Sequence, residues 1–286
     1  MRSLAPTAMA IAMQFLASVL VTGDLATDAV AQDAAGKNSF AIISWNVEAG
    51  GSEVANNLSA LKQFGPFSIL ALNEVPQEST AELAGHWGAD SFVVGESGGD
   101  GRLIVAWNPK EFEKVATAEL LQVDGKEFAP GLRAAPLTAQ LRHKASGREF
   151  MVVMNHFVRG NAELRKTQAL LLSAWAKQQK LPIIAVGGYN FDFDFATKKG
   201  NEAFDAFMAT GVWTWIEPKK LIDTNWADYN RDGKDDYPDS MLDFVFAAGQ
   251  DQPWKIACEI IVRDGDFPDN DKTSDHRPVL TVVELP

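Results

Sequence analysis

The sequence predicts one α/β domain built on mixed β-sheets. Short apolar segments rich in β-branched residues alternate with amphipathic helical segments, and a turn at 144–147 joins two of the apolar segments into a hairpin. No internal repeat, low-complexity segment or linker rich in proline, glycine and serine divides the chain. Hairpins that alternate with strand–helix units are typical of a single domain with mixed sheets.

The expected elements follow from the spacing of apolar residues. A helix is expected from Ser52, as its capping residue, to the Gly65-Pro66 pair. A longer helix is expected behind Asn161, ending before Pro182. The expected strands are 41–45, 68–75, 103–107, 137–143, 150–157, 183–186, 241–246, 257–262 and 279–285.

The first 31 residues have the pattern of a secretory signal peptide. Arg2 precedes an apolar run from Ala5 to Val21, and a small-residue stretch ends in Ala29-Val30-Ala31. We expect cleavage after Ala31, which leaves a secreted or periplasmic domain over 32–286. The alternative is an uncleaved anchor, although the run is short for a membrane-spanning helix. No later apolar run approaches spanning length, so no integral membrane segment is expected after the signal peptide.

The composition excludes several classes of protein. The chain has 286 residues, of which 46% are hydrophobic and 22% charged, and this excludes a disordered or coiled-coil chain. Its one cysteine, Cys258, excludes an intramolecular disulfide and a cysteine-built zinc or iron–sulfur site. The net charge of -12 gives no overall attraction to nucleic acid or an anionic membrane. Any polyanion must therefore be held by a local basic patch or a bound cation.

Polar side chains gather at the ends of the expected strands. Strand ends in a sheet domain converge on one rim, so these groups are expected to meet around one ligand. They are Asn46, Glu74, Asn155, His156, Asn190, Asp243, Asp275 and His276.

The residue types in this set fit the chemistry of a phosphate ester. A carboxylate such as Glu74, with oxygens from Asn46 and Asp275, suits a hard cation such as Mg²⁺. Two histidines with a buried aspartate suit a charged, oriented imidazole. Together they suit attack on a phosphate ester, whose transition state gathers negative charge on oxygen.

The polar residues belong to segments that occur in a characteristic order over about 230 residues. These segments are Trp45-Asn46, Asn73-Glu74-Val75, Asn155-His156-Phe157, Gly187-Gly188-Tyr189-Asn190, Leu242-Asp243-Phe244-Val245-Phe246 and Ser274-Asp275-His276-Arg277-Pro278-Val279. In this order they resemble the endonuclease/exonuclease/phosphatase family, which includes DNase I. The resemblance implies a DNase I-like four-layer sandwich, in which two mixed β-sheets pack face to face with helices outside.

The resemblance also implies a metal site. Glu74 would bind the catalytic cation, Mg²⁺ or Mn²⁺, with help from Asn46 and Asp275. Arg133 lies where some members of the family place a phosphate-binding arginine, and a solvated surface charge is the alternative interpretation of this residue.

Further residues would act on the phosphate. The resemblance implies that His276, paired with Asp243, holds the scissile phosphate together with His156 and stabilises its charge. Asn190 would help to position the attacking water.

Gly188 departs from the family's Gly-Asp-x-Asn motif, because it stands where the family has an aspartate that orients or deprotonates the water. Loss of a positioned general base costs about 10²–10⁴-fold in rate. Three interpretations are open: a degraded enzyme, a substitute carboxylate from Asp192 or Asp194, or an inactivating substitution in an active lineage. Both aspartates would lie on one face of an extended strand, and a solvated strand face is the preferred explanation of them.

An acidic segment before the Asp243 strand is spaced as a calcium-binding loop, with Gly233 at the turn. An acidic solvated loop is the alternative. If the segment binds Ca²⁺, ordering it would help to fix the partner of His276. Its oxygen ligands would be Asp228, Asn230, Asp232, Lys234, Asp236 and Asp239.

These observations predict an exported, monomeric, divalent-metal-dependent phosphoesterase whose activity is weakened by Gly188. Its substrate would be a phosphodiester or phosphomonoester, in nucleic acid, a lipid headgroup or a small polyol phosphate. The rival hypothesis is a non-enzymatic binding protein that has kept the fold, which the glycine favours.

Overall fold

The computed structural model describes residues 38–286 except 100, 132, 250–253 and 269–271. The predicted signal peptide therefore lies outside the described residues. Among the described helices, none is long and apolar enough to cross a membrane.

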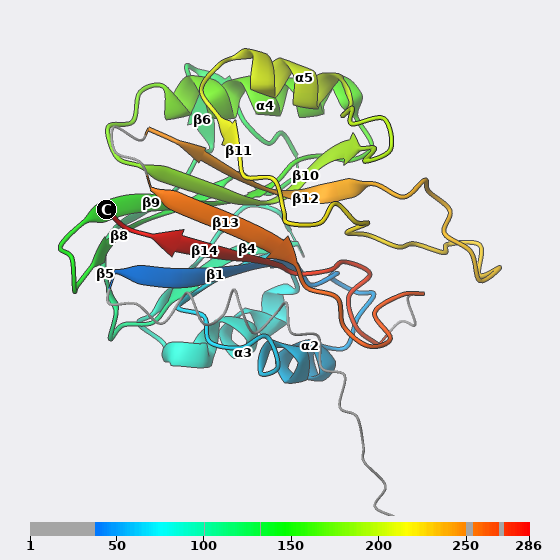
Figure 1. Cartoon of the computed structure of the whole chain (residues 1–286), viewed down its shortest axis with the longest axis horizontal. Coiled ribbons are helices and arrows are strands. Elements are labelled where there is room, and N and C mark those ends of the chain that lie inside the picture. Colours follow the sequence, from blue (N-terminus) through cyan, green and yellow to red (C-terminus); the bar gives the residue numbers. More distant parts are fainter. Residues whose placement is uncertain (1–37, 100, 132, 250–253, 269–271) are drawn as a thin grey trace, which may run out of the picture.

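Within the described residues, two six-stranded sheets pack face to face (Figure 1). The first sheet has the order β13-β14-β1-β2-β4-β3 and the second has the order β11-β12-β10-β9-β8-β5. Both are mixed, because β1 runs parallel to β2 and antiparallel to β14, while β10 runs parallel to β9 and antiparallel to β12. The strands of the first sheet are β1 (Ser39–Asn46), β2 (Ile69–Val75), β3 (Phe92–Val94), β4 (Arg102–Trp107), β13 (Lys255–Ile260) and β14 (Val279–Glu284). Those of the second are β5 (Phe112–Glu119), β8 (Leu137–His143), β9 (Glu149–His156), β10 (Ile183–Phe193), β11 (Thr214–Trp215) and β12 (Met241–Ala248).

Helices cover the outer faces of the two sheets (Figure 1). The helices α2 (Val54–Leu61) and α3 (Thr80–Ala84) lie on the first sheet, with the short 3-10 turns η1 (Gln77–Ser79) and η2 (Gly85–Trp87) on either side of α3. The helices α4 (Ala162–Ala176) and α5 (Glu202–Ala209) lie on the second sheet, and the short strands β6 (Gln122–Val123) and β7 (Lys126–Glu127) form a separate ribbon.

The apolar side chains form one layer between the sheets and one under each pair of helices. The central layer includes Phe40, Val152 and Val245, because alternate residues of each strand face the opposite sheet. The layers under the helices include Leu61 on the first sheet and Phe207 on the second. The predicted four-layer sandwich is confirmed.

All the expected helices and strands occur; the strand 137–143 has its expected bounds as β8, and the other elements have shifted ends. The predicted cap at Ser52 is wrong: α2 has Glu53 at its N-cap, and the Ser52 hydroxyl donates to the Val47 carbonyl at 2.6 Å. The predicted strand 183–186 continues to Phe193 as β10. The sequence analysis missed several elements whose apolar patterns are too short or too irregular to be recognised. They are β3, β5, β6, β7, β11, α3 and α5.

The long loops lie at one end of the sandwich. The loop between β11 and β12 and the loop between β13 and β14 extend on the same side (Figure 1). They are joined where Asn225 pairs with His276, with the Trp226 amide donating to the Asp275 carbonyl at 3.0 Å. This pairing brings segments that are far apart in the sequence to the rim where β1, β2, β9 and β10 carry their polar residues.

Candidate active site

A cavity of about 530 Å³ lies at this rim, between loops that follow strands of both sheets. Most of the predicted site residues line it, and the other two lie directly behind it, bonded to lining residues. The lining residues are Glu74, Arg133, His156, Asn190, Asp275 and His276, and the two behind them are Asn46 and Asp243. The structure therefore brings the whole predicted catalytic and metal-binding set together.

Irregular backbone turns several of these side chains into the cavity. Glu74 lies in a bulge of β2 with φ 54°, and Asn190 lies with φ 52° where the register between β10 and β12 shifts. Glu48, which also lines the cavity, has φ 53°. Residues other than glycine seldom adopt this left-handed conformation, and such strain concentrates at functional sites.

Carboxylate and amide groups form the part of the site that suits a cation. Asn46 Nδ2 donates to Glu74 Oε1 at 2.8 Å, and Asn46 Oδ1 accepts from the Glu48 amide at 2.9 Å. Glu48 Oε2 in turn accepts from the Asp275 amide at 3.0 Å, and Asn225 Nδ2 donates to Asp275 Oδ2 at 2.9 Å. The side-chain oxygens of Glu74, Asp275 and Asn46 are hard ligands for a metal ion, so this set fits Mg²⁺ or Mn²⁺.

A buried ion pair forms the opposite wall. His276 Nδ1 lies 2.7 Å from Asp243 Oδ2, and both side chains are less than 10% exposed, at 8% and 5%. Burial alone would lower the pKa of His276, but the negative charges of Asp243, Asp275 and Glu74 outweigh it and raise this pKa to about 10. The imidazole is therefore protonated at neutral pH, with its Nε2 3.8 Å from Asp275 Oδ1.

His156 connects the two groups, because its Nε2 lies 3.3 Å from Glu74 Oε1. Asn190, which also lines the cavity, donates from Nδ2 to the Phe157 carbonyl at 2.6 Å. Arg133 Nη1 donates to the nearby Pro130 carbonyl at 2.9 Å, so this exposed guanidinium is held at the cavity edge. An anion in the cavity would meet imidazole, guanidinium and amide groups.

Gly188 faces the middle of this arrangement. Its partners across the sheet are His156 on β9 and Asp243 on β12. A Cβ atom at Gly188 would lie 3.0 Å from His156 Cδ2 and 3.7 Å from Asp243 Oδ1. A carboxylate on residue 188 would thus reach the site, and glycine supplies none.

Asp192 and Asp194, the suggested substitutes, are held elsewhere. Asp192 Oδ2 accepts from Asn201 Nδ2 at 2.8 Å and lies 3.6 Å from Arg165 Nη2. Asp194 Oδ1 accepts from the backbone amides of residues 196 and 197 at 2.7 and 2.9 Å. Both aspartates line a neighbouring cavity of about 560 Å³. In the structure, neither faces Gly188.

Comparison with solved structures shows which known proteins have a similar fold. No protein-family model matches the chain, and no curated protein matches it. The chain is similar over 87% of its length to 99% of an endonuclease/exonuclease/phosphatase from Bacteroides vulgatus, with a TM-score of 0.64 and 18% identity. The chain has the endonuclease/exonuclease/phosphatase fold.

Two further solved structures have a similar fold. A mannosyl-6-phosphatase of Bacteroides thetaiotaomicron matches over 86% of this chain and 100% of its own, with a TM-score of 0.59 and 14% identity. TDP2 of D. rerio, solved in complex with a single-strand DNA product, matches over 86% and 99%, with a TM-score of 0.59 and 16% identity. The fold is thus shared by a sugar phosphatase and by a protein solved with a DNA product.

The sequence analysis missed three polar residues that line the cavity: Glu48, Arg159 and Tyr229. Arg159 Nη1 donates to Asn225 Oδ1 at 2.9 Å, and its guanidinium lies 4.3 Å from the centre of the Tyr237 ring. Glu48 follows Asn46 by two residues, which is a signal that could have been used. Arg159 and Tyr229 carried no signal, because only the folding of their loops brings them to the cavity.

The predicted calcium-loop residues are largely occupied by turn hydrogen bonds. Asp228 accepts from the amides of Asp232 and Gly233 at 2.9 and 2.7 Å, and Asp236 Oδ2 accepts from the Tyr229 amide at 2.7 Å. Asn230 Nδ2 donates to the other Asp236 oxygen at 2.7 Å.

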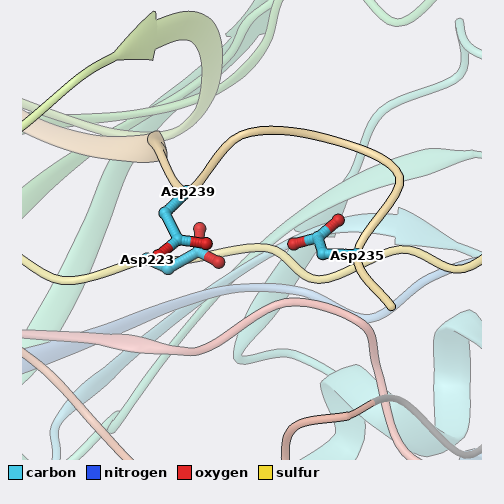
Figure 2. Close-up of side chains that lie close together, drawn as sticks. All are labelled: Asp223, Asp235 and Asp239. Atoms are coloured by element: carbon cyan, nitrogen blue, oxygen red, sulfur yellow. The ribbon is translucent and has the colours of Figure 1, made fainter. Parts of the chain in front are cut away.

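A different acidic triad in the same segment could hold an ion. Among the described residues, the carboxylates of Asp223, Asp235 and Asp239 lie within 4.8 Å of one another. Figure 2 shows Asp223 and Asp239 side by side, with the Asp235 carboxylate facing them. Of the six predicted ligands, only Asp239 belongs to this triad. Sequence spacing missed Asp223 because it precedes the loop motif.

Proposed function

We propose that the chain is a divalent-metal-dependent phosphoesterase that is exported and acts as a monomer, with activity lowered by Gly188. The observation that carries the proposal is the convergence of Glu74, His156, Asn190 and the Asp243–His276 pair on one cavity. Phosphodiesters and phosphomonoesters both suit such a site, in nucleic acid, a lipid headgroup or a small polyol phosphate. The solved phosphatase and the DNA-bound TDP2 support both classes.

In this proposal Glu74, Asn46 and Asp275 hold Mg²⁺ or Mn²⁺. The cation, when bound, supplies positive charge for the phosphate oxygens and the leaving group. The protonated His276, oriented by Asp243, donates to a phosphate oxygen and stabilises charge as it develops.

The other cavity residues bind and orient the reactants. His156 lies beside Glu74 and donates to a second phosphate oxygen. Arg133 attracts the phosphate at the cavity edge, and the Asn190 amide oxygen orients the attacking water. No side chain on residue 188 takes the proton of that water, which is the reason for expecting a slow reaction.

The second candidate function is a binding protein that retains the cleft without catalysis. Gly188 favours it, because the position that faces His156 and Asp243 carries no side chain. The retained ion pair and the strained Glu74 and Asn190 argue for catalysis, because binding a phosphate does not need an attacking water to be oriented.

The deciding experiment compares magnesium-dependent hydrolysis of plasmid DNA and bis-p-nitrophenyl phosphate by the wild-type chain and Gly188→Asp. We expect weak activity in the wild type and a rise of about 10²-fold or more in the variant. Gly85→Asp is the matched control, since it adds the same charge at an exposed glycine with open space around it. Activity in neither protein would favour the binding function. Equal activity in both would point to another carboxylate, and Glu48→Gln, Asp192→Asn and Asp194→Asn would then identify it.

We also propose a structural Ca²⁺ in the acidic segment. Calcium should raise the melting temperature and protect the segment around residues 228–239 from proteolysis. Asp235→Asn should abolish both effects if the triad with Asp223 and Asp239 binds the ion, whereas Asp232→Asn should abolish them if the predicted loop does. No effect of calcium on either measurement would refute the site.

A further inference from the structure

Asn73 carries a fully buried amide that has no hydrogen-bond partner among the described residues. The residue lies on β2 at 0% exposure, and both its Nδ2 and its Oδ1 lack a partner. A buried donor or acceptor that stays unsatisfied costs about 1–3 kcal/mol, and such groups in folded proteins are nearly always bonded. A small polar ligand at Asn73 would remove this cost.

The free donor points at the position where Gly188 lacks a side chain. A Cβ atom at Gly188 would lie 3.5 Å from Asn73 Nδ2. The same atom would lie 3.0 Å from His156 Cδ2, and the His156 ring lines the cavity, so this position borders the place proposed for the substrate. The donor and the glycine therefore lie beside each other, next to His156, which lines the cavity.

The groups around Gly188 determine which charge and size of ligand would fit beside them. Asn73 Nδ2 requires an acceptor, and the imidazoles of His156 and His276 favour an anion near them. The Asp243 carboxylate is already matched by His276 at 2.7 Å. A planar group of three heavy atoms matches the end of the missing side chain, whereas a tetrahedral oxyanion is better placed in the larger cavity.

We propose that the space at Gly188 binds a small monocarboxylate, which accepts a hydrogen bond from Asn73 Nδ2 and replaces the absent side-chain carboxylate. Formate fits best, because it lacks the methyl group that would occupy the Cβ position 3.0 Å from His156 Cδ2. Acetate requires His156 to shift by a few tenths of an ångström, and propionate exceeds the size of the missing side chain.

This inference rests on the proposed function, because the bound carboxylate would serve as the general base. One carboxylate oxygen takes a proton from water as the water oxygen bonds to phosphorus and the bond from phosphorus to the ester oxygen breaks. The departing oxygen takes a proton from solvent. The carboxylic acid then releases its proton to solvent, so the carboxylate is regenerated and not consumed.

The test measures hydrolysis of bis-p-nitrophenyl phosphate by the full chain with Mg²⁺ against increasing sodium formate, with chloride keeping the ionic strength constant. We expect a saturable rise of about tenfold or more, part of the 10²–10⁴-fold that a general base supplies. The rise should be smaller with acetate and absent with propionate. Gly188→Asp should be active without formate and should not respond to it.

Gly188→Asn fills the same space without a base, so its rate should not respond to formate. Formate should raise the melting temperature of the wild type and not that of Gly188→Asn, which reports binding without catalysis. An active Gly188→Asp beside a wild type that ignores formate would overturn this inference and leave the proposed function standing. An equal response in Gly188→Asn would also overturn it. No hydrolysis by any variant, with or without formate, would refute the proposed function and this inference with it.

Discussion

Asp243 and His276 form a buried ion pair whose partners depend on each other. Breaking such a pair by removing one charge costs about 3–5 kcal/mol, because the remaining charge stays buried without compensation. Asp243→Asn keeps the shape and one acceptor oxygen, so we expect a loss of about 3 kcal/mol in the free energy of unfolding, measured with urea at neutral pH. Asp264→Asn, at an exposed position, should change it by less than about 0.5 kcal/mol. A loss below about 1 kcal/mol for Asp243→Asn would contradict the charged pair.

The sequence alone could identify a functional charged residue where burying that charge without a partner would cost free energy. A carboxylate between Leu242 and Phe244 needs a partner, so Asp243 could be recognised before the structure was known. Arg159 could not, because a half-buried charge in a loop carries no such constraint, and the only signal for Glu48 was its place two residues after Asn46. The orphaned amide of Asn73 needed coordinates, since only they show that Gly188 lies opposite it.

At the scale of the elements, irregularities in β2 and β10 direct side chains into the site. Apolar periodicity predicted where β2 and β10 lie, but it carries no information on where a strand turns its backbone. The left-handed residues Glu74, Asn190 and Asp192 follow from packing between sheets and loops. For the same reason, the sequence left open whether Asp192 could replace the missing carboxylate.

Helix α5 supports the bulge that carries Asn190. Asn201 caps this helix through Oδ1, while its Nδ2 donates to the Asn190 carbonyl at 2.9 Å and to Asp192 at 2.8 Å. Asn201→Ala should therefore cost about 1–2 kcal/mol in unfolding free energy and should also lower kcat. Asn161→Ala is the matched control, because Asn161 caps α4 without touching the site, and should cost about 1 kcal/mol with kcat unchanged. Equal kcat in the two variants would mean that Asn201 acts on stability alone.

The acidic segment should make stability depend on pH. Burial, with Asp235 and Asp239 nearby, raises the pKa of Asp223 from 3.8 to about 6. The folded chain thus binds this proton more tightly than the unfolded chain, so the stabilisation is complete below pH 3.8 and is lost as the pH rises through about 6.

We therefore expect the stability of the wild type relative to Asp223→Asn to increase on acidification from neutral pH to below pH 6, measured by urea unfolding in the absence of divalent cations. Comparison with the variant removes the contribution of the other carboxylates. A difference that stays constant across this range would show that Asp223 does not titrate as its surroundings require.

At the scale of the whole molecule, the fold class and the meeting of the strand-end residues at one rim could be predicted, but the loops that close this rim could not. Alternating apolar segments predict one α/β domain with mixed sheets, because each face must be buried. The stacking of two sheets with helices outside came from the family resemblance. The loop that carries Asn225 and Tyr229 has no apolar periodicity of a helix or strand, yet its pairing with the His276 segment closes the cavity. That closure is a tertiary event that no local pattern encodes.

The two sheets supply different residues to the proposed site. The cation ligands Glu74 and Asn46 belong to the first sheet, whereas His156 and Asn190 belong to the second. Inorganic phosphate bound to a cation would thus bridge the sheets, and a ligand that binds only the folded chain raises the stability, by about 2.7 kcal/mol at a hundred times its dissociation constant.

We expect Mg²⁺ to raise the melting temperature, and phosphate added with Mg²⁺ to raise it further than the separate effects together. EDTA should reverse both increases. Glu74→Gln should remove the Mg²⁺ effect and the joint effect, whereas Glu78→Gln, the same change at an exposed residue nearby, should keep them. A phosphate effect that persists in Glu74→Gln or in EDTA would mean that the anion binds without the cation, and the division between the sheets would then be wrong.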